Sequence, residues 1–226
     1  MCYDILIIAE KELLEIKGSI KKLFLVLIMF FPIVMFIKTE GSESLLPLDV
    51  AVIYIPIFVA MMIAIQIVFN TFISEKREKT LEILLSSGIS NVAIVIGKSI
   101  AACFISYLFA LTAMGLVKVG FLISGSTYLV NMHWYSFVIP IFASYVAACL
   151  TMSISIIVND EKVVPLFATI VSMGVGVAIS YLIVVFKLGF RGWELIANIC
   201  ICAFVCIMAT IVTAIIIKKS AIITKI

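Results

Sequence analysis

Residues 50–73 read VAVIYIPIFVAMMIAIQIVFNTFI, and residues 74–90, which follow directly, read SEKREKTLEILLSSGIS. The first stretch carries no charge and exceeds the roughly 20 helical residues that cross a bilayer core of about 30 Å. The second opens with five consecutive charged residues, Glu75 to Lys79. Such an abrupt change marks the point where a membrane helix leaves the hydrocarbon and meets water.

Five more uncharged apolar runs occur along the chain, and together the six predict six membrane-spanning helices. The runs cover residues 23–37, 50–73, 99–117, 135–158, 164–186 and 195–217. None alternates apolar and polar residues as barrel strands do, so we expect helices. These spans leave no room for a soluble domain. The sequence therefore predicts an all-α, polytopic membrane protein in which residues 1–226 form a single transmembrane domain.

The composition excludes other broad classes. Apolar residues make up 65% of the chain and charged residues 13%, with a mean hydropathy of +1.33. Soluble domains are nearer half apolar and a quarter charged, and disordered chains are poorer still in apolar residues. The net charge is only +3, from 16 basic and 13 acidic residues, which is too small for a nucleic-acid-binding surface.

The positions of the basic residues predict the orientation. With both ends inside, twelve Lys and Arg residues fall in inner segments and four in outer segments. This bias follows the positive-inside rule and predicts a multi-pass protein of the cell membrane with cytoplasmic N- and C-termini. The acidic residues Asp4, Glu10, Glu12 and Glu15 precede the first run, unlike the basic start of a signal peptide, so we expect that helix to be retained.

Residues 1–22 predict an amphipathic helix that lies at the membrane interface. One stripe is apolar, and the other side is charged, apart from Glu12 at the edge of the stripe. The apolar positions are Ile5, Ile8, Ala9, Leu13, Ile16 and Ile20. We expect this stripe to face the membrane, because a fully solvated helix, the alternative, would leave it exposed to water.

The inner loop at residues 74–98 contains a second amphipathic helix. Glu75, Glu78 and Glu82 share one helical face, and Leu81, Leu84 and Leu85 form an apolar one. Gly88 is a plausible C-terminal stop, and Ser90 a plausible N-cap for the helix that enters the third span. A charged helix held between two spans is placed to receive force from a soluble partner. The alternative is a solvated loop that only satisfies the positive-inside rule.

In this pattern the chain resembles the permease subunits of ABC-2 type exporters, which carry E-x-x-x-x-T-L-E-x-L-L and then a Gly-Lys pair between spans two and three. The matching residues are Glu75, Thr80, Leu81, Glu82, Leu84, Leu85, Gly97 and Lys98. The chain departs from the family at Lys79 and Gly88, where relatives often have Gly and Pro, and in the short outer loop at residues 187–194.

The resemblance implies that residues 75–87 form a coupling helix that docks on a cytoplasmic ATPase. Glu82, with Glu75 and Glu78, would face basic groups of that partner, and the leucines would pack at the contact. The resemblance also implies that ATP-driven movement of this helix switches the spans between inward-open and outward-open states.

The sequence offers no enzymatic site of its own. Gly97-Lys98-Ser99 ends like a phosphate-binding loop, but Val92 stands where that motif needs glycine. His133 is the only histidine, and the six cysteines form no C-x-x-C pair, so we expect no metal or haem site and no bound cofactor. ATP would be bound and hydrolysed by the partner subunit.

Uncharged polar groups remain within the spans. Gln66 and Asn70 share a face of the second span and either line an inward vestibule or bond across an interface. Small residues recur every four positions in spans three and four, which favours close helix contact. These positions are Ala102, Ser106 and Ala110, and Ala143, Ala147, Thr151 and Ser155.

Two functions follow as hypotheses. The favoured one is the permease subunit of an ATP-driven exporter, which pairs with a second copy or a similar permease because six helices are few to enclose a pathway. The alternative is a non-transporting membrane scaffold or assembly factor that recruits a cytoplasmic partner through residues 74–98.

Overall fold

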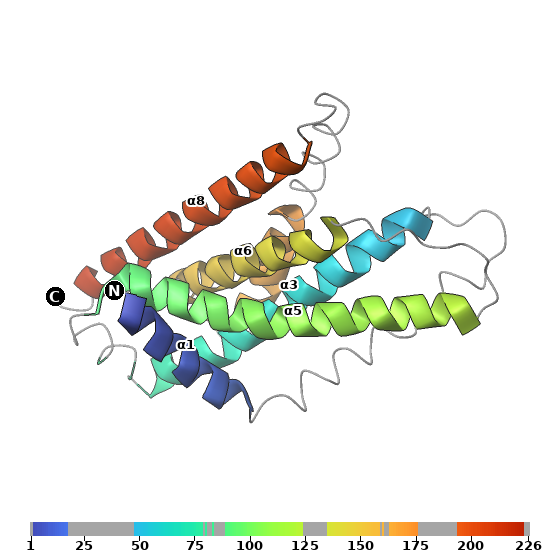
Figure 1. Ribbon diagram of the computed structural model, residues 1–226. Coiled ribbons are helices and arrows are strands. Elements are labelled where there is room, and N and C mark those ends of the chain that lie inside the picture. The colour runs from blue at the N-terminus through green and yellow to red at the C-terminus, as the bar shows by residue number, and fades with distance from the viewer. Residues whose placement is uncertain are drawn as a thin grey trace.

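A computed structural model describes residues 2–17, 48–78, 89–123, 135–158, 163–175 and 194–223, together with Thr80, Ile83 and Asp160. Every element in this part of the chain is a helix (Figure 1). The helices are α1 (Cys2–Lys17), α3 (Leu48–Arg77), α5 (Asn91–Ile123), α6 (Tyr135–Ile157), a shorter helix at Val164–Val175, and α8 (Glu194–Ile223). The all-α prediction is confirmed for these residues. The predicted span at 23–37 lies outside them, as does the second half of the one at 164–186.

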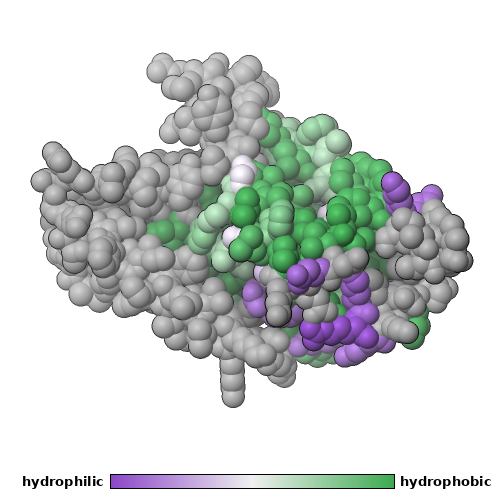
Figure 2. All heavy atoms as spheres, turned by 180° about the vertical axis from the view of Figure 1, so that it is seen from behind, coloured by the Kyte–Doolittle hydropathy of each residue, from purple (hydrophilic) through white to green (hydrophobic). Residues whose placement is uncertain are grey.

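Four of the helices are long and apolar enough to cross a membrane, which makes this a membrane-embedded helical protein. The qualifying stretches are Ile55–Arg77, Asn91–Val119, Phe137–Ile157 and Cys200–Lys219. They coincide with the predicted spans two, three, four and six. Figure 2 shows apolar surface across the middle of the molecule and hydrophilic side chains gathered towards one end.

Three helices extend beyond the apolar runs that predicted them; α8, for example, continues through Lys218 and Lys219 to Ile223. α3 continues through the charged residues to Arg77, and α5 begins at Asn91, before Lys98. Lys, Arg and Glu are good helix formers, so a helix need not end where its hydrocarbon-facing part ends. The bundle consequently has a charged end, at which α1, the last turns of α3 and the first turns of α5 meet.

The centre of the bundle is α3, which packs against both α5 and α6. Its side chains Val59, Ile63 and Phe72 are fully buried and share one core with Val95 of α5 and Met152 of α6. The expectation of close contact by small residues is confirmed by their burial. Ala102, Ser106, Ala110, Ala143, Ala147, Thr151 and Ser155 are all at most 3% exposed.

Uncharged polar side chains tie the helices together across these contacts. Ser99 of α5 lies 3.3 Å from the Cys149 sulfur of α6, and Ser144 of α6 donates to the Cys103 sulfur of α5 at 3.3 Å. Between α6 and α8, the hydroxyl oxygens of Ser153 (α6) and Thr213 (α8) lie 2.9 Å apart. Hydrogen bonds of this kind between membrane helices contribute about 0.6 kcal/mol each on average.

Ser90 caps α5 as predicted. Its Oγ accepts the backbone N–H of Ala93 at 3.2 Å, and its carbonyl accepts that of Ile94. The capped helix end carries Lys98, which is central to the site described below.

Removing this cap gives a first testable effect. Ser90→Ala is expected to lower the free energy of unfolding by about 0.5–2 kcal/mol, because one orphan N–H at the start of α5 loses its acceptor. Chemical unfolding in mixed micelles, followed by circular dichroism, measures the change. Thr112→Ala is the control: this exposed hydroxyl bonds only to the carbonyl of Phe109 within its own helix. An equal loss in both variants would show that the cap contributes nothing.

The orientation of α1 differs from the prediction. Ile8, Glu12 and Ile16, one turn apart, are 5%, 2% and 2% exposed, and α1 packs mainly against α5. For Ile8 and Ile16 the expectation that the apolar stripe faces the membrane is wrong, because protein covers these two side chains. The other described members, Ile5, Ala9 and Leu13, are half-buried, and Ile20 lies outside the described residues. A second set of apolar residues is exposed instead, namely Tyr3, Leu6, Ile7 and Leu14.

Candidate functional site

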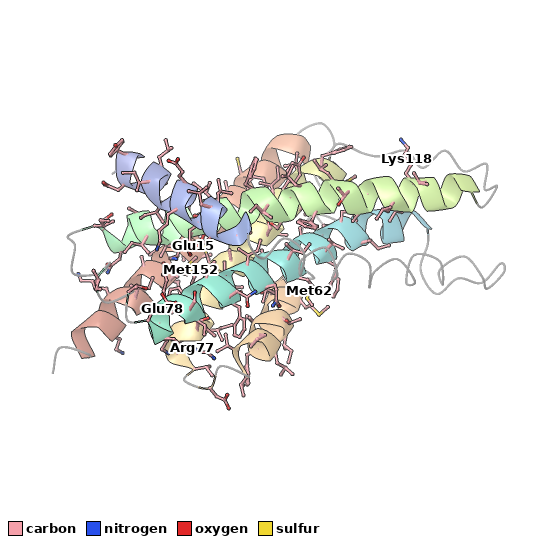
Figure 3. All side chains as sticks on the ribbon, turned by 90° about the horizontal axis from the view of Figure 1, so that it is seen from below. Glu15, Met62, Arg77, Glu78, Lys118 and Met152 are labelled. Carbon is pink, nitrogen blue, oxygen red and sulfur yellow. The ribbon has the colours of Figure 1, made fainter. Side chains whose placement is uncertain are left out.

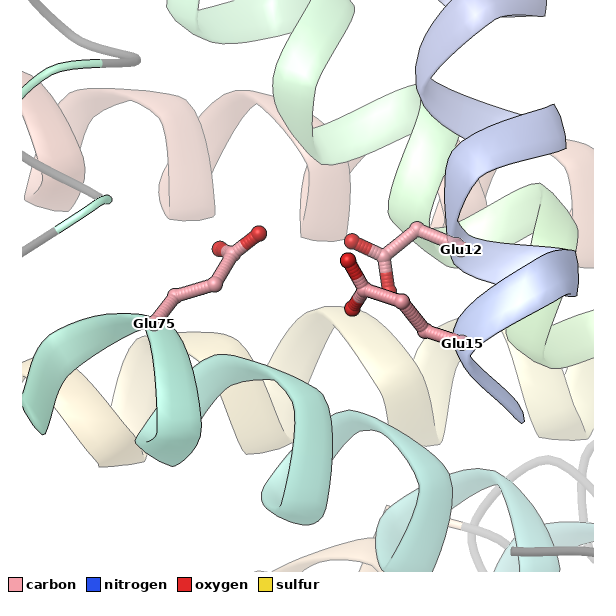
Figure 4. A group of neighbouring side chains, drawn as sticks. All are labelled: Glu12, Glu15 and Glu75. Carbon is pink, nitrogen blue, oxygen red and sulfur yellow. The ribbon is translucent and has the colours of Figure 1, made fainter. Parts of the chain in front are cut away.

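Five charged residues meet where α1, α3 and α5 come together at the charged end of the bundle. This charge cluster consists of Lys11, Glu12 and Glu15 from α1, Glu75 from α3 and Lys98 from α5. Figure 4 shows the two α1 carboxylates turned towards Glu75. The side chains of Glu12 and Lys98 are 2% exposed and that of Glu75 6%, so three charges lie almost out of contact with solvent.

Lys98 is the centre of the cluster because its one ammonium group serves carboxylates of two different helices. Its Nζ donates a hydrogen bond to Oε1 of Glu12 and lies 2.9 Å from Oε2 of Glu75. On the other oxygen of Glu75, Lys11 donates from 2.9 Å. Lys11 also lies 3.4 Å from Glu15, one turn along its own helix. A single lysine on α5 thus connects α1 to the last turn of α3.

Gly97 lets α1 approach closely enough for this contact. A Cβ at this position would lie 2.8 Å from Cγ2 and 2.9 Å from Cβ of Ile8, and 3.1 Å from the carbonyl oxygen of Ile5. No side chain fits at such distances without moving α1. The Gly-Lys pair therefore has a physical explanation in this chain: glycine makes room for α1, and the adjacent lysine reaches its buried carboxylate.

For Lys11 and Glu12, both on α1, burial and the neighbouring opposite charge have opposite effects on the pKa. Desolvation raises the pKa of Glu12 above its ordinary value, although the neighbouring charge of Lys98 opposes the shift. Partial burial has the largest single effect on Lys11 and lowers its pKa, but the hydrogen bond to Glu75 and the charges of Glu75, Glu15 and Glu12 together raise the pKa above its ordinary value. The cluster is thus a strongly coupled group of charges.

The three carboxylates of the charge cluster lie close enough together to be considered as ligands of a metal ion. Oxygen atoms of Glu12, Glu15 and Glu75 lie within 4.8 Å of one another, a spacing that can hold a cation. Two lysine ammonium groups already contact these oxygens and supply the positive charge. These contacts join α1, α3 and α5.

Of the seven predicted coupling residues, the structure describes three: Glu75, Glu78 and Thr80. Glu75 does not lie on an exposed face beside Glu78 as expected, because it belongs to α3 and turns into the charge cluster. Thr80 donates from its hydroxyl to the Glu75 carbonyl at 3.3 Å, at the end of the helix. Glu78 is exposed. Leu81, Glu82, Leu84 and Leu85 lie outside the described residues.

Lys76 has a contact that the sequence interpretation missed. Its Nζ donates to the carbonyl oxygen of Ser155 at 3.3 Å, within the last turn of α6. A cation there also meets the negative end of the helix dipole. Two consecutive charged residues at the end of α3 therefore contact different helices: Glu75 contacts α1 and α5, and Lys76 contacts α6.

Gln66 and Asn70 are both half-buried on α3. Asn70 lines a shallow hollow of about 260 Å³ on the side of α3, and Gln66 is not part of its wall. The hollow is otherwise lined by Phe69, Ile73, Ser74, Arg77 and Glu78. Figure 3 shows Arg77 and Glu78 near the end of the bundle that carries Glu15, with Lys118 at the opposite end. The roles of Gln66 and Asn70 in a pathway or an interface stay predictions.

Comparison of the sequence with protein-family models and with curated proteins finds no match. The resemblance to ABC-2 type permeases therefore rests on the residues of the inner loop and on the predicted arrangement of spans.

Proposed function

We propose that the protein is the membrane-spanning permease subunit of an ATP-driven ABC exporter in the cell membrane. Six helices cross the bilayer with both termini in the cytoplasm, and two permease chains, identical or similar, together form the translocation pathway. A separate cytoplasmic ABC ATPase supplies the energy through residues 75–87. The permease itself binds no nucleotide.

The charge cluster is the observation that carries this proposal. Glu75 lies at the end of α3, immediately before the charged loop, and its two oxygens contact lysines of α1 and α5. A displacement of the loop would act on Glu75 first and through it on both other helices. Removing one partner of a buried ion pair is costly, so such a contact resists separation under load.

The structure narrows the set of residues proposed to meet the ATPase. Glu75 and Thr80 are engaged within the chain, so we assign them to anchoring the loop. Contact with the ATPase is assigned to the exposed Glu78 and to Glu82, with Leu81, Leu84 and Leu85 packing at the interface. The positive residues expected on the partner would face these two carboxylates.

A charge reversal at Glu82 tests the assignment. Glu82→Lys is expected to abolish the coupling of ATP hydrolysis to export while the protein still inserts, because the substitution leaves all five residues of the charge cluster unchanged. The measurement compares export and ATP hydrolysis in vesicles that contain the permease and its co-purified ATPase. Glu10→Lys is the matched control, since it reverses an exposed charge on α1 outside the cluster.

Two outcomes would count against the proposal. Unchanged export in Glu82→Lys would remove this residue from the coupling contact. A chain that binds a cytoplasmic partner without any substrate-dependent hydrolysis would instead be the scaffold or assembly factor, because a passive scaffold does not stimulate turnover.

A further inference from the structure

The charges of the cluster do not balance. Glu12, Glu15 and Glu75 contribute three carboxylates, whereas Lys11 and Lys98 contribute two ammonium groups. With every group ionised the cluster carries a net charge of −1. Three of its five side chains are at most 6% exposed, where an uncompensated charge is costly.

Glu12 is the carboxylate least able to stay ionised. It faces Lys98 of α5, Glu75 of α3, and Lys11 and Glu15 of its own helix. Its hydrogen-bonding cation, Lys98, is shared with Glu75. Glu75 has Lys11 as a second cation, and Glu15 is 41% exposed and partly solvated. Of the two deeply buried carboxylates in the cluster, Glu12 is therefore the one whose single contacting cation among the described residues is shared.

We propose that Glu12 is a proton-binding site, and that α1 docks on α3 and α5 with one proton on this carboxyl group. Binding the proton brings the cluster to net neutrality: Lys11 and Lys98 balance Glu15 and Glu75. The remaining carbonyl oxygen of Glu12 still accepts the hydrogen bond from Lys98. This inference does not depend on the ATPase, because it concerns only groups within the chain.

The direction of the pH dependence follows from burial. Desolvation raises the pKa of Glu12 above 4.5 when α1 is docked, so the docked state holds the proton more tightly than a detached α1 does. The stabilisation of docking by this proton is fully present below about pH 4.5 and is lost as pH rises through the raised pKa. When the proton leaves, two buried carboxylates share Lys98, and its hold on Glu75 at the base of the loop weakens.

Infrared titration of the full-length protein in lipid nanodiscs tests the proposal. As the pH falls from about 8 to about 4, the C=O stretch of a protonated carboxylic acid is expected to appear with a midpoint above the ordinary value of 4.5. Other carboxyl groups of the chain also protonate near pH 4, so the signal of Glu12 is the part of the band that Glu12→Gln removes and Glu15→Gln retains. Both substitutions remove one negative charge from the protein. A difference between them therefore comes from the position of the carboxyl group and not from the overall charge.

Amide hydrogen exchange of α1 supplies the second readout. After correction for intrinsic exchange, protection of α1 in the wild type should rise as pH falls, and in Glu12→Gln it should stay constant. A wild-type minus Glu12→Gln difference band with a midpoint at or below 4.5, or no difference between the two proteins, would overturn the proposal. Should Glu12→Gln fail to fold, Glu12→Asp keeps a carboxyl group and must shift the midpoint; an unshifted band would equally overturn it.

Discussion

Lys98→Met is expected to lower the free energy of unfolding by about 3–5 kcal/mol, the largest effect of any single substitution considered for this protein. Methionine fills a similar volume, so the loss comes from charge. Among the described residues, Glu12 would keep no cation within hydrogen-bonding distance, and Glu75 would keep only Lys11, which is 48% exposed. Buried carboxylates without a partner oppose the docking of α1.

Unfolding in mixed micelles measures this effect, with Lys118→Met as the matched control. Lys118 is exposed and lies at the opposite end of the bundle (Figure 3), so its loss should change stability by less than about 0.5 kcal/mol. The double variant Lys98→Met/Glu12→Gln should recover part of the stability, since glutamine at position 12 is neutral and needs neither a cation nor a proton when it is buried. Equal stability of Lys98→Met and Lys118→Met would show that the charge cluster does not hold the helices together.

Gly97→Val is expected to detach α1 from α5 while leaving every charge in place. The new Cβ would fall 2.8–2.9 Å from Ile8 and 3.1 Å from the backbone of Ile5, and neither can turn aside as the end of a long side chain does. Overpacking of this kind typically costs about 1–3 kcal/mol. Valine has a higher intrinsic helix propensity than glycine, so α5 itself should be intact.

Gly115→Val makes the same substitution in the same helix at a position where a Cβ meets nothing within 4 Å. Trypsin cleavage after Lys11, compared with the wild type, is expected to accelerate in Gly97→Val and to stay unchanged in Gly115→Val. Similar cleavage rates in the two variants would contradict the close seating of α1 on Gly97. The two glycines thus separate loss of docking from any general effect of valine in α5.

The helices themselves could be predicted from the sequence because the hydropathy of a stretch indicates whether it is more stable in hydrocarbon or in water. α3, α5, α6 and α8 all contain the apolar runs that predicted them. Their ends could not be predicted in the same way. The charged residues up to Arg77 follow the apolar run but still belong to α3. A change in composition therefore does not mark the end of a helix.

The sequence singles out Glu12, Glu75 and Lys98 of the charge cluster one by one, but it does not predict that they meet. Glu75 and Lys98 belong to the loop pattern, and Glu12 was noticed because it interrupts an apolar stripe. Such an interruption is a usable signal: a carboxylate on a face that is otherwise buried needs a cation opposite it. Which lysine supplies that cation depends on how α1 crosses α5, and sequence spacing does not contain that information.

The central claim is that residues 75–87 receive ATP-driven movement from a cytoplasmic partner. The most direct measurement purifies the tagged full-length protein from its own membranes in mild detergent and follows ATP hydrolysis by the isolated complex. We predict that an ABC ATPase co-purifies, that its hydrolysis responds to membrane extract containing the substrate, and that Glu82→Lys removes this response. Purification without any ATPase, or hydrolysis that is identical with wild-type and Glu82→Lys chains, would contradict the account.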